Sequence, residues 1–213
     1  MKRTVCYVFA CALLGVSGPL LAAEINFCGE LKNHYGPYDF IRDRASGKME
    51  IVEGAHFTAD VENGNPRGST GTLGADLDYT LRAIPNHHRA LETIGRVSLR
   101  AKTFQLPSAR FPTECYFDRA IRFAPTDAMV RAAYGNYLSA LGRTAEALAM
   151  FQAAADLAPE NPTISYNLGL LYMKTKKYDK AAEYADRAYA QGFPLQGLRN
   201  QLAQVRKGSG DAR

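Results

Sequence analysis

Apolar residues recur three and four positions apart through the last two-thirds of the chain. Alanine and leucine carry this pattern from Leu73 to Val205, and its spacing is that of amphipathic helices. Proline-containing breaks interrupt it at 85–86, 105–112, 125–127, 159–161 and 193–194. The pattern predicts an all-α region over residues 72–206, built from helices that each bury one face.

The stretch from 24 to 71 has a different composition. Glycine, proline and asparagine recur there, and the apolar residues come in short clusters. Residues 63–69 are typical of turns, because Asn and Gly tolerate positive φ and Pro blocks a helix. Lys48 to Val52 indicates a short strand. We expect an irregular but ordered N-terminal segment over 24–71 and a flexible, Gly-rich tail over 207–213.

Two parts of the helical region align with each other at an offset of about 34 residues, a length common among helical repeats. Gly135 aligns with Gly169, and Ala147 aligns with Ala181. Two antiparallel helices that cross closely favour a residue without a side chain. We therefore expect both glycines to lie at helix crossings, with the two alanines opposite them.

These residues resemble the tetratricopeptide repeat, a helix–turn–helix unit of this length. The unit beginning at Ala128 has the characteristic residues of the family at their places: Gly135, Ala147, Phe151, Ala154 and Pro159. The unit beginning at Pro162 departs from the pattern at Ala185, where a large aromatic residue is usual. The resemblance implies an all-α superhelical array with an irregular N-terminal segment.

An earlier unit, from His88 to Asp127, also resembles the repeat. The connection between its helices, within 101–112, is about six residues longer than the family pattern. A half unit over Asp76 to Ile84 precedes it. A final helix from Leu195 to Arg206 would cap the array, as a repeat array needs for solubility.

In this family the first helices of successive units line the concave side of the array. Arg89, Glu92, Arg96 and Arg100 are spaced to share one such helix face. The predicted groove residues are Arg89, Arg96, Arg100, Asn136, Tyr166, Asn167 and Lys174. Arginine binds carboxylates bidentately and asparagine both donates and accepts, so we expect a peptide, and in particular an acidic one. The alternative is a solvated arginine face or one covered by the N-terminal segment.

The first 23 residues predict export. Lys2 and Arg3 precede an apolar run to Val16, and small residues follow up to Ala23, which is the order of a cleavable secretory signal peptide. The run is shorter than the roughly 20 residues that span a bilayer, so we expect no stable membrane insertion after cleavage. It is also short for a lipoprotein signal ending at Cys11. For a bacterial source the mature protein would be periplasmic.

The net charge argues against a nucleic-acid-binding protein, and the cysteine content predicts a disulfide. The net charge is +5, and removal of Lys2 and Arg3 leaves +3. That is too mild to indicate nucleic-acid binding, which needs a clustered basic face. Cys28 and Cys115 are the cysteines that remain after cleavage. An oxidising compartment favours a disulfide between them over two free thiols.

Signatures of catalysis are absent from the sequence. The four histidines, His34, His56, His87 and His88, lack zinc-site spacing, and there is no Gly-rich phosphate loop or nucleophile elbow. We expect a scaffold or adaptor, not an enzyme, that binds another exported protein or peptide without a cofactor or metal. The alternative is a small-ligand or metal site between the N-terminal segment and the first helices, which requires that segment to fold back.

Overall fold

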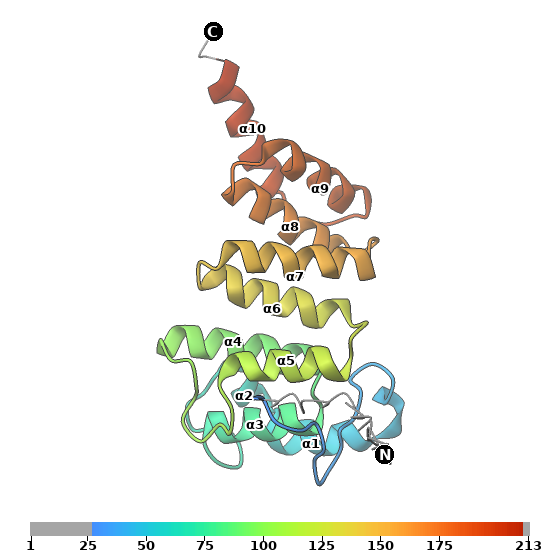
Figure 1. The fold of residues 1–213 in the computed structure, drawn as a ribbon, viewed down its shortest axis with the longest axis vertical. Helices are drawn as coiled ribbons and strands as arrows, with labels where there is room; N and C mark the ends of the chain where they lie inside the picture. The colour runs from blue at the N-terminus through green and yellow to red at the C-terminus, as the bar shows by residue number, and fades with distance from the viewer. Residues whose placement is uncertain (1–26, 211–213) are drawn as a thin grey trace, which may run out of the picture.

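The structure, a computed structural model, describes the backbone of residues 27–210 and the side chains of residues 27–207. Over this range the chain forms ten α-helices and one short 3-10 helix, with no strand (Figure 1). The elements are η1 (Arg44–Ser46), α1 (Lys48–His56), α2 (Ala59–Asn63), α3 (Leu73–Ala83), α4 (His88–Ala101), α5 (Thr113–Phe123), α6 (Ala128–Ala140), α7 (Thr144–Leu157), α8 (Pro162–Lys174), α9 (Tyr178–Ala190) and α10 (Gly197–Gly210). The predicted signal peptide and Cys11 lie outside the described residues.

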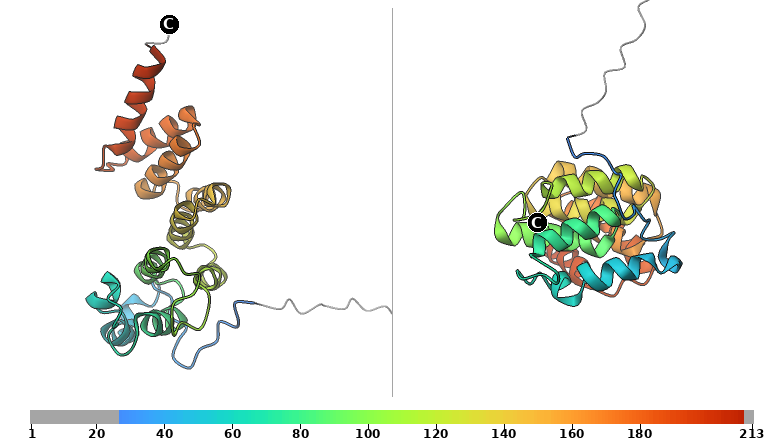
Figure 2. Two further views of the ribbon diagram at one scale, coloured as in Figure 1. Left: turned by 90° about the vertical axis from the view of Figure 1, so that its left-hand side faces the viewer. Right: turned by 90° about the horizontal axis from the view of Figure 1, so that it is seen from below.

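The helices stack along the long axis of the molecule: α1, α2 and α3 lie at one end, α4 and α5 come next, and α6 to α10 follow in chain order to the other end (Figure 1). α6 packs against α7, and α8 packs against α9, as two helical hairpins. Successive pairs are rotated relative to one another, so the stack twists (Figure 2). The predicted all-α array of helix–turn–helix units is confirmed.

Each hairpin begins at a strong cap. Asp127 precedes α6, and its side chain accepts the amides of Met129 and Val130. Asn161 plays the same part before α8, where Pro162 occupies the first turn. Asp and Asn at the N-cap satisfy amides that have no partner within the helix, and proline is tolerated at this place because its missing N–H is not needed there. The proline-containing breaks at 125–127 and 159–161 therefore fall between units.

The glycines lie where helices cross, as the alignment predicts. A Cβ atom added at Gly135 would lie 2.7 Å from the Phe151 ring, and one at Gly169 would lie 2.5 Å from a methyl group of Leu198. The carbonyl oxygen of Ala181 is 3.4 Å from the same point at Gly169. Since cores are packed as densely as organic crystals, neither position has room for a side chain without a shift of its neighbour.

The N-terminal segment differs from expectation between 48 and 52. The predicted strand is wrong, because these residues open helix α1 instead. Met49 and Val52, three residues apart, are fully buried against Ala83 and Ile84 at the end of α3. The three-residue spacing of these two contacts suits a helix and not a strand.

A covalent link joins this segment to the array. Cys28 and Cys115 form the predicted disulfide, across 87 residues of sequence. Arg119, one turn further along α5 and 1% exposed, donates from Nη1 to the carbonyl oxygens of Cys28 and Glu30, at 3.1 and 2.6 Å. The first described residues are therefore held against α5 by the disulfide and by a buried guanidinium.

The last helix extends beyond the predicted end. The predicted helix stops at Arg206 and a flexible tail begins at 207, whereas α10 continues to Gly210. Leu198 and Leu202 are the buried residues of its first half. None of the helices in the described part of the chain is long and apolar enough to cross a membrane.

Candidate binding groove

The three groove arginines share one face of α4, but the chain itself occupies part of that face. Arg89 forms an ion pair with Glu62 of α2, and its Nε donates to Oε1 at 2.6 Å. Arg96 donates to the carbonyl of Glu62, and Arg100 donates to the carbonyl of Gly64 at 2.8 Å. These guanidiniums have partners within the chain, in agreement with the alternative interpretation of the sequence. Their binding to a peptide stays a prediction.

Apolar contacts hold α2 in this place. Val61 is fully buried, and Phe57 just before α2 is 4% exposed; both belong to the main core at this end of the array. The guanidinium of Arg89 lies over the Phe57 ring, 5.4 Å from its centroid. The hydrogen bond from Arg89 is the largest cause of the lowered pKa of Glu62. Burial therefore positions α2, and the ion pair aligns it with α4.

An open groove remains between α4 and α6. It encloses about 380 Å³ and has apolar and polar walls, contributed by Leu91, Glu92, Gly95, Arg96, Leu99, Phe117, Ala133, Asn136 and Tyr137. Gly95 lets α6 approach, because a Cβ there would lie 3.2 Å from the Tyr137 ring. Of the predicted groove residues, Arg96 and Asn136 meet here.

Glu92 belongs to this groove and was not among the predicted site residues. Neither Glu92 nor Asn136 has a hydrogen-bond partner among the described residues, so both can bind a ligand. The loss of solvent around Glu92 is the main reason that its pKa is raised. A hydrogen-bond donor on a ligand would stabilise the ionised Glu92 carboxylate. The sequence could have indicated Glu92 as a groove residue, because its three- and four-residue spacing from Arg89 and Arg96 places all three on one helix face.

The predicted groove residues of the unit that begins at Pro162 lie apart from this groove. Tyr166 is 7% exposed, and its ring stacks on Phe193 at 4.2 Å between centroids. That burial removes it from an open surface. Lys174 is exposed and donates to the carbonyl of Ser139 at 3.1 Å. Asn167 is half-buried, with no hydrogen-bond partner in the described chain.

The histidines lie where the N-terminal segment folds back on the array. Three of the four each face one carboxylate: His56 is paired with Asp76, His87 with Glu53, and His88 with Asp127, at 2.8–2.9 Å. Within the described residues no three His, Cys, Asp or Glu side chains gather as a metal set. The N-terminal segment thus folds back on the array, and these polar pairs join the two parts at a junction.

Burial and hydrogen bonding set the charge of this junction. Burial lowers the pKa of His87, although the Glu53 carboxylate acts in the opposite direction. The hydrogen bond from His87 is in turn the main reason that the pKa of Glu53 is lowered. Burial opposes ionisation of Asp127, but the hydrogen bond from His88 and others outweigh it and lower its pKa. The junction thus favours neutral His87 beside ionised carboxyl groups.

A second pocket lies between the start of α3, the end of α4 and the connection that follows α4. It encloses about 320 Å³ and is lined mainly by apolar groups, from Pro66, Thr72, Leu73, Gly74, Val97, Arg100, Ala101, Leu106 and Pro107. Leu106 and Pro107 come from the long connection predicted between α4 and α5. A Cβ added at Gly74 would lie 3.1 Å from the Cβ of Leu106, so this connection packs directly on α3.

Comparison with known proteins shows that the repeat fold of this chain occurs in other proteins. The family model of the tetratricopeptide repeat matches residues 133–194. A crystal structure of MamA protein has a TM-score of 0.54 at 17% identity, over 78% of this chain and 84% of that chain. PilF of Pseudomonas aeruginosa has a TM-score of 0.54 at 19% identity, over 76% of this chain and 68% of that chain. No curated protein sequence matches. Identities this low show a shared fold and nothing finer.

Proposed function

Because this chain is a tetratricopeptide-repeat protein, we propose that it acts as a scaffold that binds a segment of another protein in the groove between α4 and α6. The repeat fold supports a scaffold. The observation that carries the proposal is the groove itself, where Glu92 and Asn136 have no partner beside an apolar floor that includes Phe117 and Tyr137. Such a mixture of apolar floor and few polar groups is typical of binding sites.

The groove suggests what the bound segment looks like. An apolar side chain would fill the space beside Leu99 and Phe117. Asn136 can bond the peptide backbone as donor and as acceptor. Glu92 would select a segment with a basic group. An overall acidic partner has less support here, because Arg89, Arg96 and Arg100 all donate to groups of α2 or to Gly64 directly after it.

Peptides selected from a displayed random library against the whole protein provide a probe. Titration calorimetry of a selected peptide should show weaker binding to Asn136→Ala, by about 1 kcal/mol for each hydrogen bond lost. Asn200→Ala is the matched control, because Asn200 is exposed on α10 and outside this groove. Equal affinity of Glu92→Gln, Asn136→Ala and the wild type for every selected peptide would rule out this groove.

We also propose export to the periplasm. The predicted signal peptide and a disulfide between Cys28 and Cys115 support it, since structural disulfides persist in oxidising compartments. N-terminal sequencing of the protein from a bacterial periplasmic fraction should begin at Glu24. Recovery of the full-length chain in the cytoplasmic fraction alone would contradict this.

The pocket at α3 and α4 favours a second candidate function, the binding of a small apolar acid. Its apolar walls would hold a short chain, and the Arg100 guanidinium, which donates one N–H to Gly64, would offer its other donors to the carboxylate. Octanoate is a suitable probe, with binding followed by NMR. Ala101→Leu should fill the pocket and abolish binding, and Ala140→Leu, at an exposed position on α6, should not. No binding to the wild type would exclude this candidate.

A further inference from the structure

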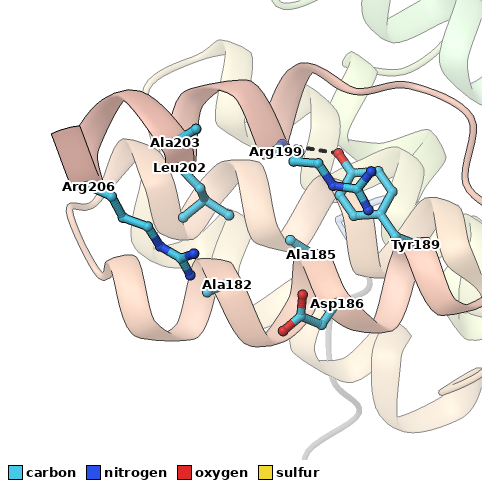
Figure 3. A pocket seen from close by; sticks show the side chains of 8 residues that line it. All are labelled: Ala182, Ala185, Asp186, Tyr189, Arg199, Leu202, Ala203 and Arg206. Carbon is cyan, nitrogen blue, oxygen red and sulfur yellow. Dashed lines mark hydrogen bonds between the residues drawn. The ribbon is translucent and has the colours of Figure 1, made fainter.

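A groove of about 450 Å³ lies between the last two helices, at the far end of the array from the N-terminal segment. We term it the terminal groove (Figure 3). α9 contributes Ala182, Ala185, Asp186 and Tyr189, and α10 contributes Arg199, Leu202, Ala203 and Arg206. Its floor is apolar and shallow, with short side chains. Its rim carries the two arginines on one side and Asp186 on the other (Figure 3).

The same groove exists one unit earlier, where the chain fills it. At the offset of about 34 residues, the α10 positions of the terminal groove correspond to Ser165, Leu168, Gly169 and Tyr172 of α8. All four are buried, because α9 lies over them. The Tyr184 ring of α9 stacks on that of Tyr172 at 5.5 Å between centroids. Gln152 of α7 reaches Tyr172 from the other wall, at 3.1 Å.

The corresponding face of α10 has no helix over it in the described chain. Arg199, Ala203 and Arg206 are exposed, in contrast to their buried counterparts in α8. Ala203 takes the place of Gly169, where α9 approaches so closely that the Ala181 carbonyl would lie 3.4 Å from a Cβ. A small residue at this position allows the backbone of another helix to come near. The shape of the terminal groove is therefore that of a seat for one helix.

The wall of the groove is fixed before any ligand arrives. The hydroxyl of Tyr189 donates to the carbonyl of Leu195 at 3.0 Å and accepts the amide of Arg199 at 3.1 Å. The guanidinium of Arg199 lies over the Tyr189 ring, 4.1 Å from its centroid. These contacts anchor the first turn of α10 on α9. A binding helix would not have to order this wall, which favours affinity.

Charge indicates the chemistry of the occupant. From Gly197 to Lys207, α10 has three basic residues and no acidic residue. The side chains of Arg206 and Asp186 have no ion-pair or hydrogen-bond partner among the described residues. A helix bound in the terminal groove could place acidic side chains near Arg199 and Arg206 of α10, and a basic side chain near Asp186 of α9. Opposite charges across an interface fix the orientation of the partner.

We propose that the terminal groove binds one amphipathic helix of a partner protein, with small residues facing Ala203 and acidic residues facing Arg199 and Arg206. The occupant takes the place that α9 holds over α8. This site is separate from the groove between α4 and α6, and either one can fail its test without the other.

The probe is a synthetic helical peptide with alanines at the spacing of Ala181, Ala185 and Ala188, and with glutamates along one edge. It should bind the whole wild-type protein in a fluorescence-anisotropy titration. A matched peptide with lysines in place of the glutamates should bind about tenfold more weakly or not at all, because like charges then face each other. Raised salt should weaken the acidic peptide, since exposed charge pairs are screened.

Two variants of the protein complete the test. Ala203→Arg fills the seat and should reduce binding of the acidic peptide by about tenfold or more. Gln204→Arg makes the same addition of charge at the next position of α10, also exposed but outside the groove, and should not reduce binding. Both variants should melt as the wild type does. Absence of binding to the wild type, or equal binding to Ala203→Arg, would overturn the proposal. A wild-type dimer that Ala203→Arg dissociates would overturn the partner helix in favour of a second copy of this chain.

Discussion

At the scale of single residues, the packing between helices depends on positions without a side chain. Gly135 lets the Phe151 ring lie directly on the backbone of α6, and Phe151 is 1% exposed. The alternation of a glycine and a large ring fills the space that two alanines would leave partly empty. A rigid ring pressed against backbone has little freedom to move aside.

Gly135→Ala should therefore destabilise the protein by about 1–3 kcal/mol through overpacking, measured as the free energy of unfolding in urea. Gly54→Ala serves as control, because Gly54 lies within α1 and nothing lies within 4 Å of its added Cβ. That control should stabilise by up to about 1 kcal/mol, since alanine is the better helix former. A loss of stability from Gly54→Ala, or none from Gly135→Ala, would contradict the packing described for these sites.

His87 couples the stability of this junction to pH. It caps α4 by accepting the Ala90 amide at Nδ1, and its Nε2 lies 2.9 Å from a carboxylate oxygen of Glu53. Because burial lowers the pKa of His87, its stabilising contribution is full above the unfolded value of about 6.5. It is lost as the pH falls through that value towards the folded one, because the unfolded state then binds the proton more readily.

His87→Asn tests this sign. Asn keeps an acceptor for the cap but cannot titrate or reach Glu53, so at pH 7.5 the variant should be less stable by about 1–3 kcal/mol. Urea unfolding at pH 7.5 and at pH 5.5 gives the difference from the wild type at each pH. That difference should shrink at pH 5.5. A difference that grows on acidification would mean that folded His87 is protonated.

At the scale of elements, the last repeat is completed by α10: a side chain of α10 fills the space that an aromatic ring of the preceding helix fills in the earlier unit. We call this substitution of one side chain for another the exchange. Ala185 stands in α9 where Phe151 stands in α7, one repeat earlier. The space that the missing ring leaves over Gly169 is taken by Leu198 of α10, which is fully buried. The departure of Ala185 from the family pattern, visible in the sequence, is thus compensated by the next helix.

A double-mutant cycle measures this exchange. Leu198→Ala should cost about 2–5 kcal/mol, and Ala185→Phe should cost about 1–3 kcal/mol because the ring would meet Leu198. In the double variant the ring can enter the vacated space, so the total cost should be smaller than the sum by about 0.5–3 kcal/mol. Strict additivity would show that the two side chains do not share one space.

Helix periodicity predicted some elements and not others. The helices from α3 to α9 bury faces with the three- and four-residue spacing, and so their existence follows from the pattern. α1 is short, and its β-branched pair Ile51 and Val52 favoured a strand; only contact with the end of α3 decides for a helix. The alignment of α2 with α4 involves Glu62 and Arg89, 27 residues apart, and no local pattern predicts which distant groups meet.

At the scale of the whole molecule, the N-terminal segment and the first helices form one packed unit. Phe57 and Val61 belong to the same core as Leu77 and Ile94, and the disulfide closes a loop that contains them all. The sequence predicted the disulfide because the two cysteines remain alone after the signal peptide. It could not predict how much of α4 the segment covers, and therefore placed Arg89 and Arg100 in an open groove.

Replacing both cysteines, as Cys28→Ser with Cys115→Ala, should destabilise the protein by about 4 kcal/mol, since a loop of this length is constrained in the unfolded state. Urea unfolding with and without dithiothreitol provides the measurement. The reductant should lower the stability of the wild type to that of the double variant and leave the double variant unchanged. Insensitivity of the wild type to reductant would mean that the disulfide contributes nothing.

The exchange between Ala185 and Leu198 has a consequence for the history of the chain. Repeat arrays lengthen by duplication of units, and a unit copied in between α9 and α10 would separate these two residues. The lengthened array would then have a void over Gly169 unless a ring returned at 185 or a branched side chain arrived with the new helix. Among descendants of one ancestor, positions 185 and 198 should therefore covary: a large ring at 185 with a small residue at 198, or the reverse.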